Sequence, residues 1–389
     1  MWFELGGEIL GNWLNRARIS LLVPIWCVFS PALSASRDTP DWLRIRHFSV
    51  GRSKPGISPA DSLNSSPATL RFQESTFVMS EHTIRIATRS SQLALWQAEH
   101  VQSLIADARP DVTVEIVHVN TIGDRNQTDA LRQFGGTGVF TKEVQNVVLS
   151  ADCDIAVHSL KDLPTLESSG LALAGIPARA AVFDALLLPD GRPLESLDEL
   201  PAGARVGTGS PRRQAQLLSA RADLQMLEIR GNVDTRLRKL DEGQYDAIVL
   251  AEAGLRRLGL SDRISFLLQP PLMYPAVGQG AIGIECREDD TATMAVLQAI
   301  SVADVVTATM AERALLQTLR AGCHAPLGCL TQQQADRLQL TGVLLSADGT
   351  QRVEATAERP CHEATAMGQE VAQLLIDQGG QSLLTGDDS

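Results

Sequence analysis

The sequence has 389 residues, of which 44% are hydrophobic and 21% charged, a globular composition with enough length for two or three hydrophobic cores. Its formal net charge of -12 excludes the broad basic surface that nucleic acids and anionic membranes require, so neither is expected as a partner. The 6 cysteines lie far apart without a CxxC pair, which favours free thiols in a reducing compartment such as the cytoplasm and supports no metal site.

Residues 1–82 read differently from the rest of the chain and are expected to lie outside the fold. The segment 19–35 is largely apolar, but two prolines interrupt it, so it is too short for a membrane span. The segment 36–77 is polar, contains Pro and Ser and has no periodicity, which favours a disordered extension or a misread start. A signal peptide remains the alternative, because basic residues precede the apolar segment.

Beyond this segment, strand-like and helix-like patterns alternate along the chain. The predicted strands cover 83–87, 112–119, 155–157, 205–207, 224–229 and 247–250. The predicted helices cover 91–108 and 141–149 and begin again at Pro211 and near Val233. This order predicts an α/β fold with largely parallel sheets and helices on both faces, in which ligands bind at the carboxyl ends of strands.

The C-terminal part is predicted to form a small α/β domain. A long helical pattern covers 303–319 and stops before Gly322. The segments 338–345 and 353–357 flank Asp348-Gly349, which is a hairpin signal, and 364–376 has the pattern of an amphipathic helix. This domain follows the turn that contains Cys323.

The segment Gly207-Thr208-Gly209-Ser210-Pro211-Arg212-Arg213-Gln214 predicts a helix N-terminus that presents amide donors. Ser210 is suited to the N-cap and Pro211 to the first helical position, and the glycines allow the backbone to approach a ligand. Two arginines in the first turn are unfavourable against the helix dipole, so an external anion would explain Arg212 and Arg213. The alternative is a pair of solvated arginines.

Further arginines follow other predicted strands. Arg230 and Arg236 flank one such loop, and Arg89 follows the first strand. Because a guanidinium group binds carboxylate or phosphate in a planar bidentate fork, several converging arginines suit a ligand with several carboxylates. Each arginine could instead pair with a nearby Asp or Glu of the protein.

Lys161 and Asp162 come directly after the predicted buried strand 155–157, and Pro164 disfavours a helix through this turn. A carboxylate at this position could take and return protons or stabilise a cationic intermediate. A solvated Lys-Asp surface pair is the alternative. His158 is interpreted as a hydrogen-bonded structural residue rather than a catalyst.

Cys323 lies in the segment Ala321-Gly322-Cys323-His324-Ala325-Pro326-Leu327-Gly328, between a helix and the last domain. A thiol in such a turn is accessible for covalent attachment, and nearby arginines would lower its pKa. The alternative for a lone cysteine is a small buried hydrophobic residue.

Seven stretches taken together resemble the hydroxymethylbilane synthase (porphobilinogen deaminase) family from about Thr83 nearly to the C-terminus. They are RIATRSSQLALWQA, DIAVHSLKDLPT, GTGSPRRQ, IRGNVDTRL, YDAIVLAEAGLRRLGL, PAVGQGAIGIECR and AGCHAPLG. The resemblance implies three α/β domains, the first two like the halves of a type II periplasmic binding protein. Their expected bounds are 83–180 with 281–298, 186–274 and 303–389.

The resemblance also implies an enzyme that condenses four porphobilinogen molecules into linear hydroxymethylbilane in tetrapyrrole biosynthesis. Cys323 would hold a dipyrromethane cofactor through a thioether, as a primer for chain growth. Asp162 would be the catalytic aspartate, which assists loss of ammonia and stabilises the cationic pyrrole. A monomer is expected.

The remaining site residues are also carried over from the resemblance. The expected cofactor-binding residues are Lys161, Thr208, Ser210, Arg212, Arg213 and Arg230. The expected substrate-binding residues are Arg89, Ser91, Lys142, Arg236, Arg257 and Gln279. Two positions depart from the family: Thr137 replaces a frequent Lys, and Gly209 replaces a common Ser.

A non-catalytic carboxylate-binding protein of the periplasmic type is the rival interpretation, which the apolar N-terminal segment would suit. It predicts an unmodified Cys323 and no release of ammonia. The two interpretations therefore differ in the covalent state of one cysteine.

Overall fold

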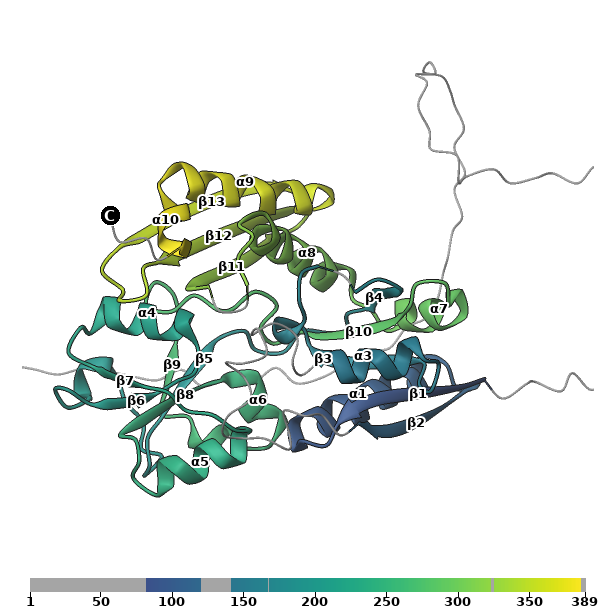
Figure 1. Cartoon of the computed structure of the whole chain (residues 1–389), viewed down its shortest axis with the longest axis horizontal. Coiled ribbons are helices and arrows are strands. Elements are labelled where there is room, and N and C mark those ends of the chain that lie inside the picture. The colour runs from purple at the N-terminus through teal and green to yellow at the C-terminus, as the bar shows by residue number, and fades with distance from the viewer. Residues whose placement is uncertain (1–81, 120–140, 167, 323–324, 386–389) are drawn as a thin grey trace, which may run out of the picture. The chain divides into compact units, whose positions relative to one another are not determined.

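The computed structural model describes residues 82–119, 141–166, 168–322 and 325–385 (Figure 1). The expectations for residues 1–81, for Thr137 and for the side chain of Cys323 fall outside the described residues. Residues Thr76–Ser389 form one compact unit, and the described part of it contains three β-sheets.

The first sheet has the strand order β2-β1-β3-β10-β4. Its strands are β1 (His82–Arg89), β2 (Val112–Val119), β3 (Ile155–Ser159), β4 (Leu171–Gly175) and β10 (Ile282–Arg287). The associated helices are α1 (Gln92–Ala108), α3 (Lys142–Leu149) and α7 (Thr291–Ala299). β1 pairs in parallel with β2 and β3, whereas β10 runs antiparallel to β3 and β4. The carboxyl ends of β1 and β3 therefore lie at the same edge of the sheet.

The second sheet has the same arrangement, with the strand order β7-β6-β8-β5-β9. Its strands are β5 (Asp184–Leu187), β6 (Arg205–Gly207), β7 (Gln225–Leu227), β8 (Ala247–Ala251) and β9 (Phe266–Leu268). The helices are α4 (Pro211–Ala220), α5 (Val233–Asp241) and α6 (Glu252–Arg257). Again one strand, β5, runs antiparallel to its two neighbours.

The third sheet is antiparallel and contains β11 (Leu327–Gln334), β12 (Arg337–Leu345) and β13 (Arg352–Pro360). It is accompanied by three helices, α8 (Ala303–Thr318), α9 (Ala364–Asp377) and α10 (Gly380–Thr385). Leu315, Leu340 and Val371 are fully buried in one core that joins α8 and α9 to the sheet. Burial of such side chains supplies most of the stability of a small layered domain.

The predicted α/β fold is confirmed, and each five-stranded sheet is largely parallel, as expected. The predicted hairpin around Asp348-Gly349 is present as β12 and β13. The sequence interpretation did not identify β4, β5, β9, β10, β11, α6, α7 and α10. Most of these elements are short, so their periodicity is difficult to detect. The domain bounds stay a prediction.

Two crossover segments connect the first and second sheets: 176–183 leads to β5, and 269–281 returns to β10. Their backbones lie against each other, because the amide of Ala180 donates to the carbonyl of Gly280 at 3.1 Å. Gly280 has a φ of +83°, and a Cβ there would lie 2.7 Å from the carbonyl oxygen of Ala180. Only glycine tolerates both constraints.

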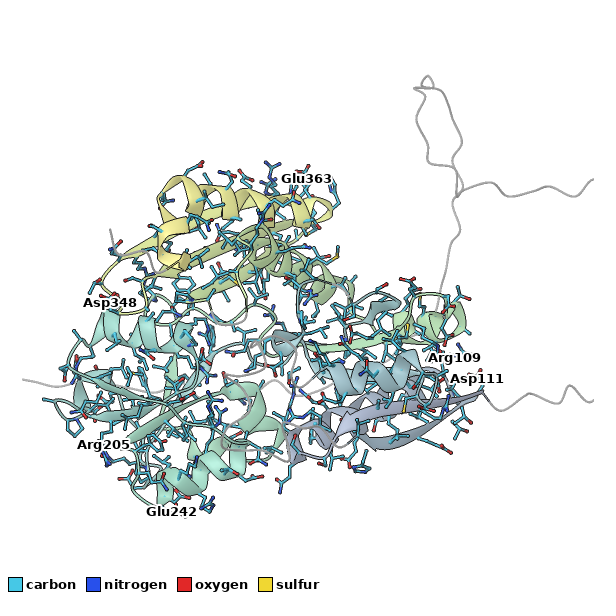
Figure 2. The ribbon with its side chains drawn as sticks, in the orientation of Figure 1. Arg109, Asp111, Arg205, Glu242, Asp348 and Glu363 are labelled. Atoms are coloured by element: carbon cyan, nitrogen blue, oxygen red, sulfur yellow. The ribbon has the colours of Figure 1, made fainter. Side chains whose placement is uncertain are left out.

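Exposed charges lie at the periphery of the view and form local pairs, such as Arg109 with Asp111 at 2.6 Å (Figure 2). Exposed pairs of this kind contribute little stability. The buried charged groups near the crossovers are instead connected in a network.

Candidate active site

Lys161 and Asp162 belong to a short 3-10 helix, η1 (Leu160–Asp162), at the carboxyl end of β3. Leu160 anchors this turn, because its side chain is buried and its amide donates to the carbonyl of Ala281 at 3.0 Å. The turn then directs Asp162 to the surface and Lys161 toward the protein interior. The predicted position of both residues at a strand end is confirmed.

Asp162 lines a cavity of about 110 Å³ at the carboxyl ends of β1 and β3. The lining residues are Arg89, Ser91, Leu93, Ala94, Gln97, Thr141, Val144, Val157, His158, Ser159 and Asp162. The cavity thus brings together three of the predicted site residues. The Ser91 hydroxyl accepts from the amide of Ala94 at 3.3 Å, so it caps α1 and fixes the cavity wall.

A buried polar network begins on the other side of η1. Nζ of Lys161 donates to Oε1 of Gln279 at 3.3 Å. The Gln279 amide nitrogen donates to the carbonyl of Val182 at 2.7 Å and to Oδ1 of Asp184 at 3.1 Å. Gln279 and Asp184 are fully buried, so this network connects η1 to the second sheet without intervening solvent.

Arg212 and Arg213 occupy the first turn of α4, where both side chains are buried. Nε and Nη2 of Arg213 donate to Oδ1 of Asp184 at 2.9 and 2.7 Å. Nη2 of Arg212 forms an ion pair with Oδ2 of Asp184 at 2.8 Å, and Nη1 donates to the carbonyl of Tyr274 at 2.6 Å. The two arginines are therefore not solvated. Both pair with a carboxylate of the protein, Asp184, which was the alternative to an external anion.

The charges in this network alter each other's protonation. Burial would raise the pKa of Asp184, but the charges of Arg212, Arg213 and Lys161 lower it to about 2. Burial lowers the pKa of Lys161 to about 8, although the negative charge of Asp162 opposes this shift. Lys161, Arg212 and Arg213 thus surround the single carboxylate of Asp184. The network keeps excess positive charge when Lys161 is protonated.

The loop before α4 positions Thr208 and Ser210. The Thr208 hydroxyl accepts from the amide of Ser210 at 3.2 Å. Ser210 occupies the N-cap position and Pro211 the first helical position, as predicted, but the Ser210 side chain makes no capping hydrogen bond. A Cβ at Gly209 would lie 3.1 Å from the carbonyl oxygen of Ile229, so this turn packs closely against the next strand end.

Arg230 and Arg236 flank the turn at Gly231, whose φ is +113°. Nε of Arg230 donates to Glu228 at 2.7 Å, so this arginine pairs with a protein carboxylate. Nε of Arg236 donates to the carbonyl of Gly231, at 2.7 Å. Burial and the charge of nearby Arg213 lower the pKa of Arg236 to about 10, while Asp162 acts in the opposite direction. Arg236 therefore lies within electrostatic range of Asp162.

Arg257 lies against backbone and an aromatic ring, whereas Lys142 is exposed. Nη2 of Arg257 donates to the carbonyl of Gly280 at 2.7 Å, and its guanidinium carbon lies 5.4 Å from the centroid of the Trp96 ring. Lys142 begins α3, next to the cavity residue Thr141, and its own side chain is exposed. It is not among the residues that line the cavity.

The buried acids of the site region were missed in the sequence interpretation. Asp184 opens an otherwise apolar strand, and Glu312 lies on the buried face of α8. An acidic residue within an apolar pattern is a signal that the sequence contained in both places. Glu285 is also buried and lies 3.0 Å from His158. This contact agrees with the structural role expected for His158, and buried charges of this kind require a partner.

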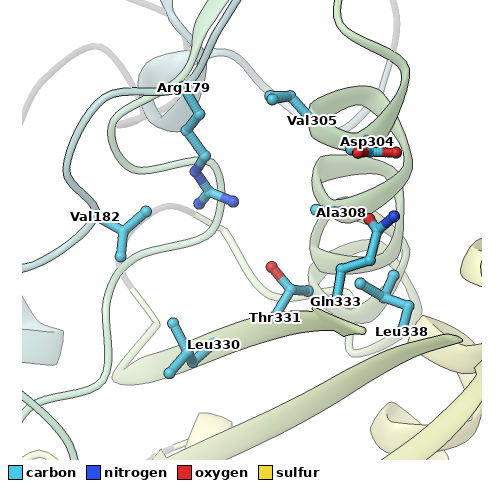
Figure 3. A pocket seen from close by; sticks show the side chains of 9 residues that line it. All are labelled: Arg179, Val182, Asp304, Val305, Ala308, Leu330, Thr331, Gln333 and Leu338. Carbon is cyan, nitrogen blue, oxygen red and sulfur yellow. The ribbon is translucent and has the colours of Figure 1, made fainter. Parts of the chain in front are cut away.

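A second cavity, of about 240 Å³, lies between the first crossover segment, α8 and the third sheet (Figure 3). Arg179 at its edge donates from Nη1 and Nη2 to the two carboxylate oxygens of Glu312, at 2.7 and 2.9 Å. Glu312 also accepts from the Gly278 amide and the Thr331 hydroxyl, each at 2.8 Å. The guanidinium at this cavity is thus already bound by a protein carboxylate.

No cluster of three or more His, Cys, Asp or Glu suitable for a metal ion occurs among the described residues. No single described helix is long and apolar enough to cross a membrane, and α7 and α8 reach that length only as a pair bent by 109°.

Comparison with known families gives two matches that together cover most of the described chain. The family described as "Porphobilinogen deaminase, dipyromethane cofactor binding domain" matches residues 84–295. The family described as "Porphobilinogen deaminase, C-terminal domain" matches residues 306–377. The first match contains the cavity, the buried network and all the arginines described above.

Curated relatives give the same result. The porphobilinogen deaminase of Stenotrophomonas maltophilia is 45% identical over 302 residues, which cover 78% of this chain and 99% of that protein. The porphobilinogen deaminase of Syntrophotalea carbinolica is 43% identical over 306 residues, which cover 79% of this chain and 96% of that protein.

Solved structures that resemble the chain include periplasmic binding proteins. The aliphatic sulphonate-binding protein SsuA of Escherichia coli matches with a TM-score of 0.34 and 13% identity, over 62% of this chain and 71% of that one. The VFT2 domain of Bordetella pertussis BvgS matches with a TM-score of 0.35 and 16% identity, over 56% and 86% of the two chains.

Proposed function

Since the chain belongs to the porphobilinogen deaminase family, we propose that its hydroxymethylbilane synthase reaction is carried out at Asp162, with a primer anchored at Cys323. The enzyme is a transferase of tetrapyrrole biosynthesis, which condenses four porphobilinogen molecules into linear hydroxymethylbilane with loss of ammonia. The proposal concerns which residues of this chain perform each task.

The position of Asp162 is the observation that carries the proposal. Its exposed carboxylate lines the cavity and lies within electrostatic range of both Lys161 and Arg236. Loss of ammonia from the aminomethyl group of porphobilinogen leaves a positive charge conjugated with the pyrrole nitrogen. An exposed carboxylate in this cavity can stabilise that charge and then accept the proton that the attacking pyrrole releases.

The residues around Asp162 fit a polycarboxylate cofactor. Lys161, Arg212 and Arg213 bring three positive charges to the single carboxylate of Asp184. Nε of Arg212 is buried and has no hydrogen-bond partner in the described part of the chain. Together with Thr208, Ser210 and Arg230, they would hold the acetate and propionate groups of a dipyrromethane. When bound, this group supplies the terminal pyrrole to which each new unit is joined.

Cys323 is proposed as the covalent anchor because its position in the sequence falls between α8 and β11, next to Gly322. Four other cysteines, all among the described residues, are free, and three of these are buried. Burial raises the pKa of the Cys329 thiol well above its ordinary value, so Cys329 is poorly suited to act as a nucleophile.

The incoming porphobilinogen is assigned to Arg89, Ser91, Lys142, Arg236 and Arg257. Arg236 and Arg257 support this role best, because each donates to a backbone carbonyl and neither forms an ion pair with a described carboxylate. Gln279 is better suited to positioning than to contact. Its amide group is occupied by Val182, Asp184 and Lys161, so it holds Lys161 in place.

We further propose that the protein acts as a monomer in the cytoplasm. Free thiols at Cys153, Cys286, Cys329 and Cys361 are consistent with a reducing compartment. Size-exclusion chromatography with light scattering would test the oligomeric state.

Intact-mass measurement tests the central proposal. The purified protein should carry a covalent adduct equal to two condensed pyrrole units and should release ammonia from porphobilinogen. Cys323→Ala should lack the adduct and the activity, whereas the control Cys361→Ala should keep both. An unmodified, inactive wild-type protein that still binds porphobilinogen would instead favour a non-catalytic carboxylate-binding protein.

A further inference from the structure

Arg257 is held differently from Arg212, Arg213 and Arg230. Arg212 and Arg213 pair with Asp184, and Arg230 pairs with Glu228. Arg257 forms no ion pair with any residue that the structure describes, and its only hydrogen bond there runs from Nη2 to Gly280. Its Nε is buried and has no hydrogen-bond partner among the described residues. The group therefore remains a cation with unused donors.

The face of an indole ring takes the place of a carboxylate partner. The guanidinium carbon of Arg257 lies 5.4 Å from the centroid of the Trp96 ring. This distance is within the range of a cation–π interaction, in which the negative face of the ring attracts the cation without accepting a directed hydrogen bond. Trp96 also stacks on His100, one helical turn further along α1, with ring centroids 5.0 Å apart and an interplanar angle of 21°.

The contact joins the two large sheets. Trp96 belongs to α1, which packs on the first sheet, and Arg257 ends α6, which follows β8 of the second sheet. The helices approach closely, since a Cβ at Gly254 would lie 3.6 Å from the side chain of Leu93. The arginine is thus held at the junction of two units by a side chain from the opposite one.

We propose that Trp96 is a positioning residue for the reaction, which holds the Arg257 guanidinium charged and oriented toward a carboxylate of porphobilinogen. A carboxylate in place of the indole would hold Arg257 equally well but would neutralise it and compete with the substrate. An aromatic face stabilises the cation and leaves Nη1 free to donate. This inference rests on the proposed function, since it deepens the role assigned there to Arg257.

Two further observations support this arrangement. Burial lowers the pKa of Arg257 to about 10, so the site disfavours the charge and an additional stabilising contact is needed. Burial, and then the charge of Arg257, lower the pKa of His100. The imidazole behind Trp96 is therefore neutral at neutral pH, and it adds no second positive charge that would repel Arg257.

Steady-state kinetics of the intact holoenzyme test the proposal. Trp96→Leu should raise the KM for porphobilinogen on the order of five-fold and change kcat less than two-fold, because a cation–π contact is lost. Trp96→Phe, which keeps an aromatic face, should restore most of the affinity. Leu104→Ala removes a side chain of the same helix that, like Trp96, packs against the core of the first sheet. It should lower the unfolding temperature and leave KM unchanged.

A double variant separates positioning from a purely structural effect. If Trp96 acts through Arg257, adding Trp96→Leu to Arg257→Gln should raise KM no further than Arg257→Gln does alone. Independent, multiplicative effects would overturn the proposal, and so would an unchanged KM in Trp96→Leu when the wild type is active. A wild-type protein that releases no ammonia would overturn the proposed function itself and this inference with it.

Discussion

Lys161 and Asp162 are adjacent in sequence but have opposite surroundings. Asp162 is exposed at the cavity, whereas Lys161 reaches the buried amide of Gln279. Because η1 turns by about a third of a revolution per residue, consecutive side chains point in different directions. One short turn therefore supplies both a solvent-accessible carboxylate and an enclosed ammonium group.

Asp162→Asn should reduce turnover of porphobilinogen at least 100-fold, because the amide neither accepts a proton nor stabilises a cation as a carboxylate does. The covalent adduct and the unfolding temperature should remain close to those of the wild type, since Asp162 lies at the surface. Asp152→Asn, at another exposed position, provides the control for activity. Near-normal turnover in Asp162→Asn would contradict the proposed role.

The lowered pKa of Lys161 predicts a pH dependence of cofactor assembly. Lys161 titrates near pH 8 in the folded protein and near 10.5 when unfolded, so its charge is lost as the pH rises through about 8. Adduct formation on apo-protein, followed by intact mass, should slow between pH 7 and 9. Lys161→Arg should remove much of this decline, because a guanidinium stays charged; identical profiles would exclude Lys161 as its cause.

Deprotonation of Lys161 should slow cofactor assembly but increase the stability of the fold. Folding disfavours protonated Lys161, and this penalty is fully present below about pH 8 and disappears as the pH rises toward 10.5. Asp184, whose pKa is lowered to about 2, contributes stability above about pH 4 that is lost as the pH falls toward 2.

Asp184→Ala should destabilise the protein by about 3 to 5 kcal/mol, because it leaves two buried guanidinium groups without a carboxylate. Thermal unfolding monitored by circular dichroism would measure the effect as a lower midpoint temperature. Asp190→Ala removes an acid whose side chain is 61% exposed and should change stability by less than about 0.5 kcal/mol. Equal midpoints for the two variants would argue against the buried network as a source of stability.

At the scale of elements, the crossover segments determine where the site forms. β5 and β10 are the antiparallel strands of their sheets, and each begins directly after a crossover. Asp184 opens β5, and Gln279 precedes β10, so the two crossovers bring both residues beside η1. The polar network is therefore a consequence of sheet topology.

Gly280→Ala should destabilise the protein more than Gly259→Ala. Both glycines have positive φ, +83° and +70°, so each substitution carries a backbone cost of roughly 1 to 2 kcal/mol. Only at Gly280 would the new Cβ also meet backbone oxygens, 2.7 Å away. The unfolding temperature of Gly280→Ala should therefore be lower than that of Gly259→Ala. Equal unfolding temperatures would mean that the close contact between the crossovers adds no stability.

At the scale of the whole described molecule, the third sheet is joined to the crossovers through Glu312. Its carboxylate binds Arg179 and the Gly278 amide of the two crossovers and the Thr331 hydroxyl of β11. Arg179 in turn donates from Nε to the carbonyl of Gln279 at 2.9 Å. The two buried networks therefore share Gln279.

Glu312→Ala should lower stability by about 3 to 5 kcal/mol, because it leaves the buried guanidinium of Arg179 unpaired. Glu363→Ala is a suitable control, since that residue pairs with Arg359 at the surface (Figure 2). It should cost less than about 1 kcal/mol. A similar small loss for both variants, measured by thermal unfolding, would show that the Arg179 contact does not hold the third sheet in place.

The sequence by itself determined the order of most elements, the α/β class and the chemistry at the strand ends. Apolar periodicity located α1, β2 and α8, because the core-facing side of an element must be apolar whatever it packs against. The position of Asp162 beyond β3 and the family motifs were likewise local properties of the chain.

Only the tertiary structure decided which charges meet. Arg213 pairs with Asp184 across 29 positions, and Lys161 reaches Gln279 across 118. The Arg257 guanidinium of α6 lies over the Trp96 ring of α1. Whether an arginine is neutralised by a protein carboxylate or left for a ligand depends on burial and on distant neighbours, which local pattern does not encode. Among the arginines proposed to bind carboxylates, Arg236 and Arg257 donate to backbone carbonyls and form no ion pair with a described carboxylate.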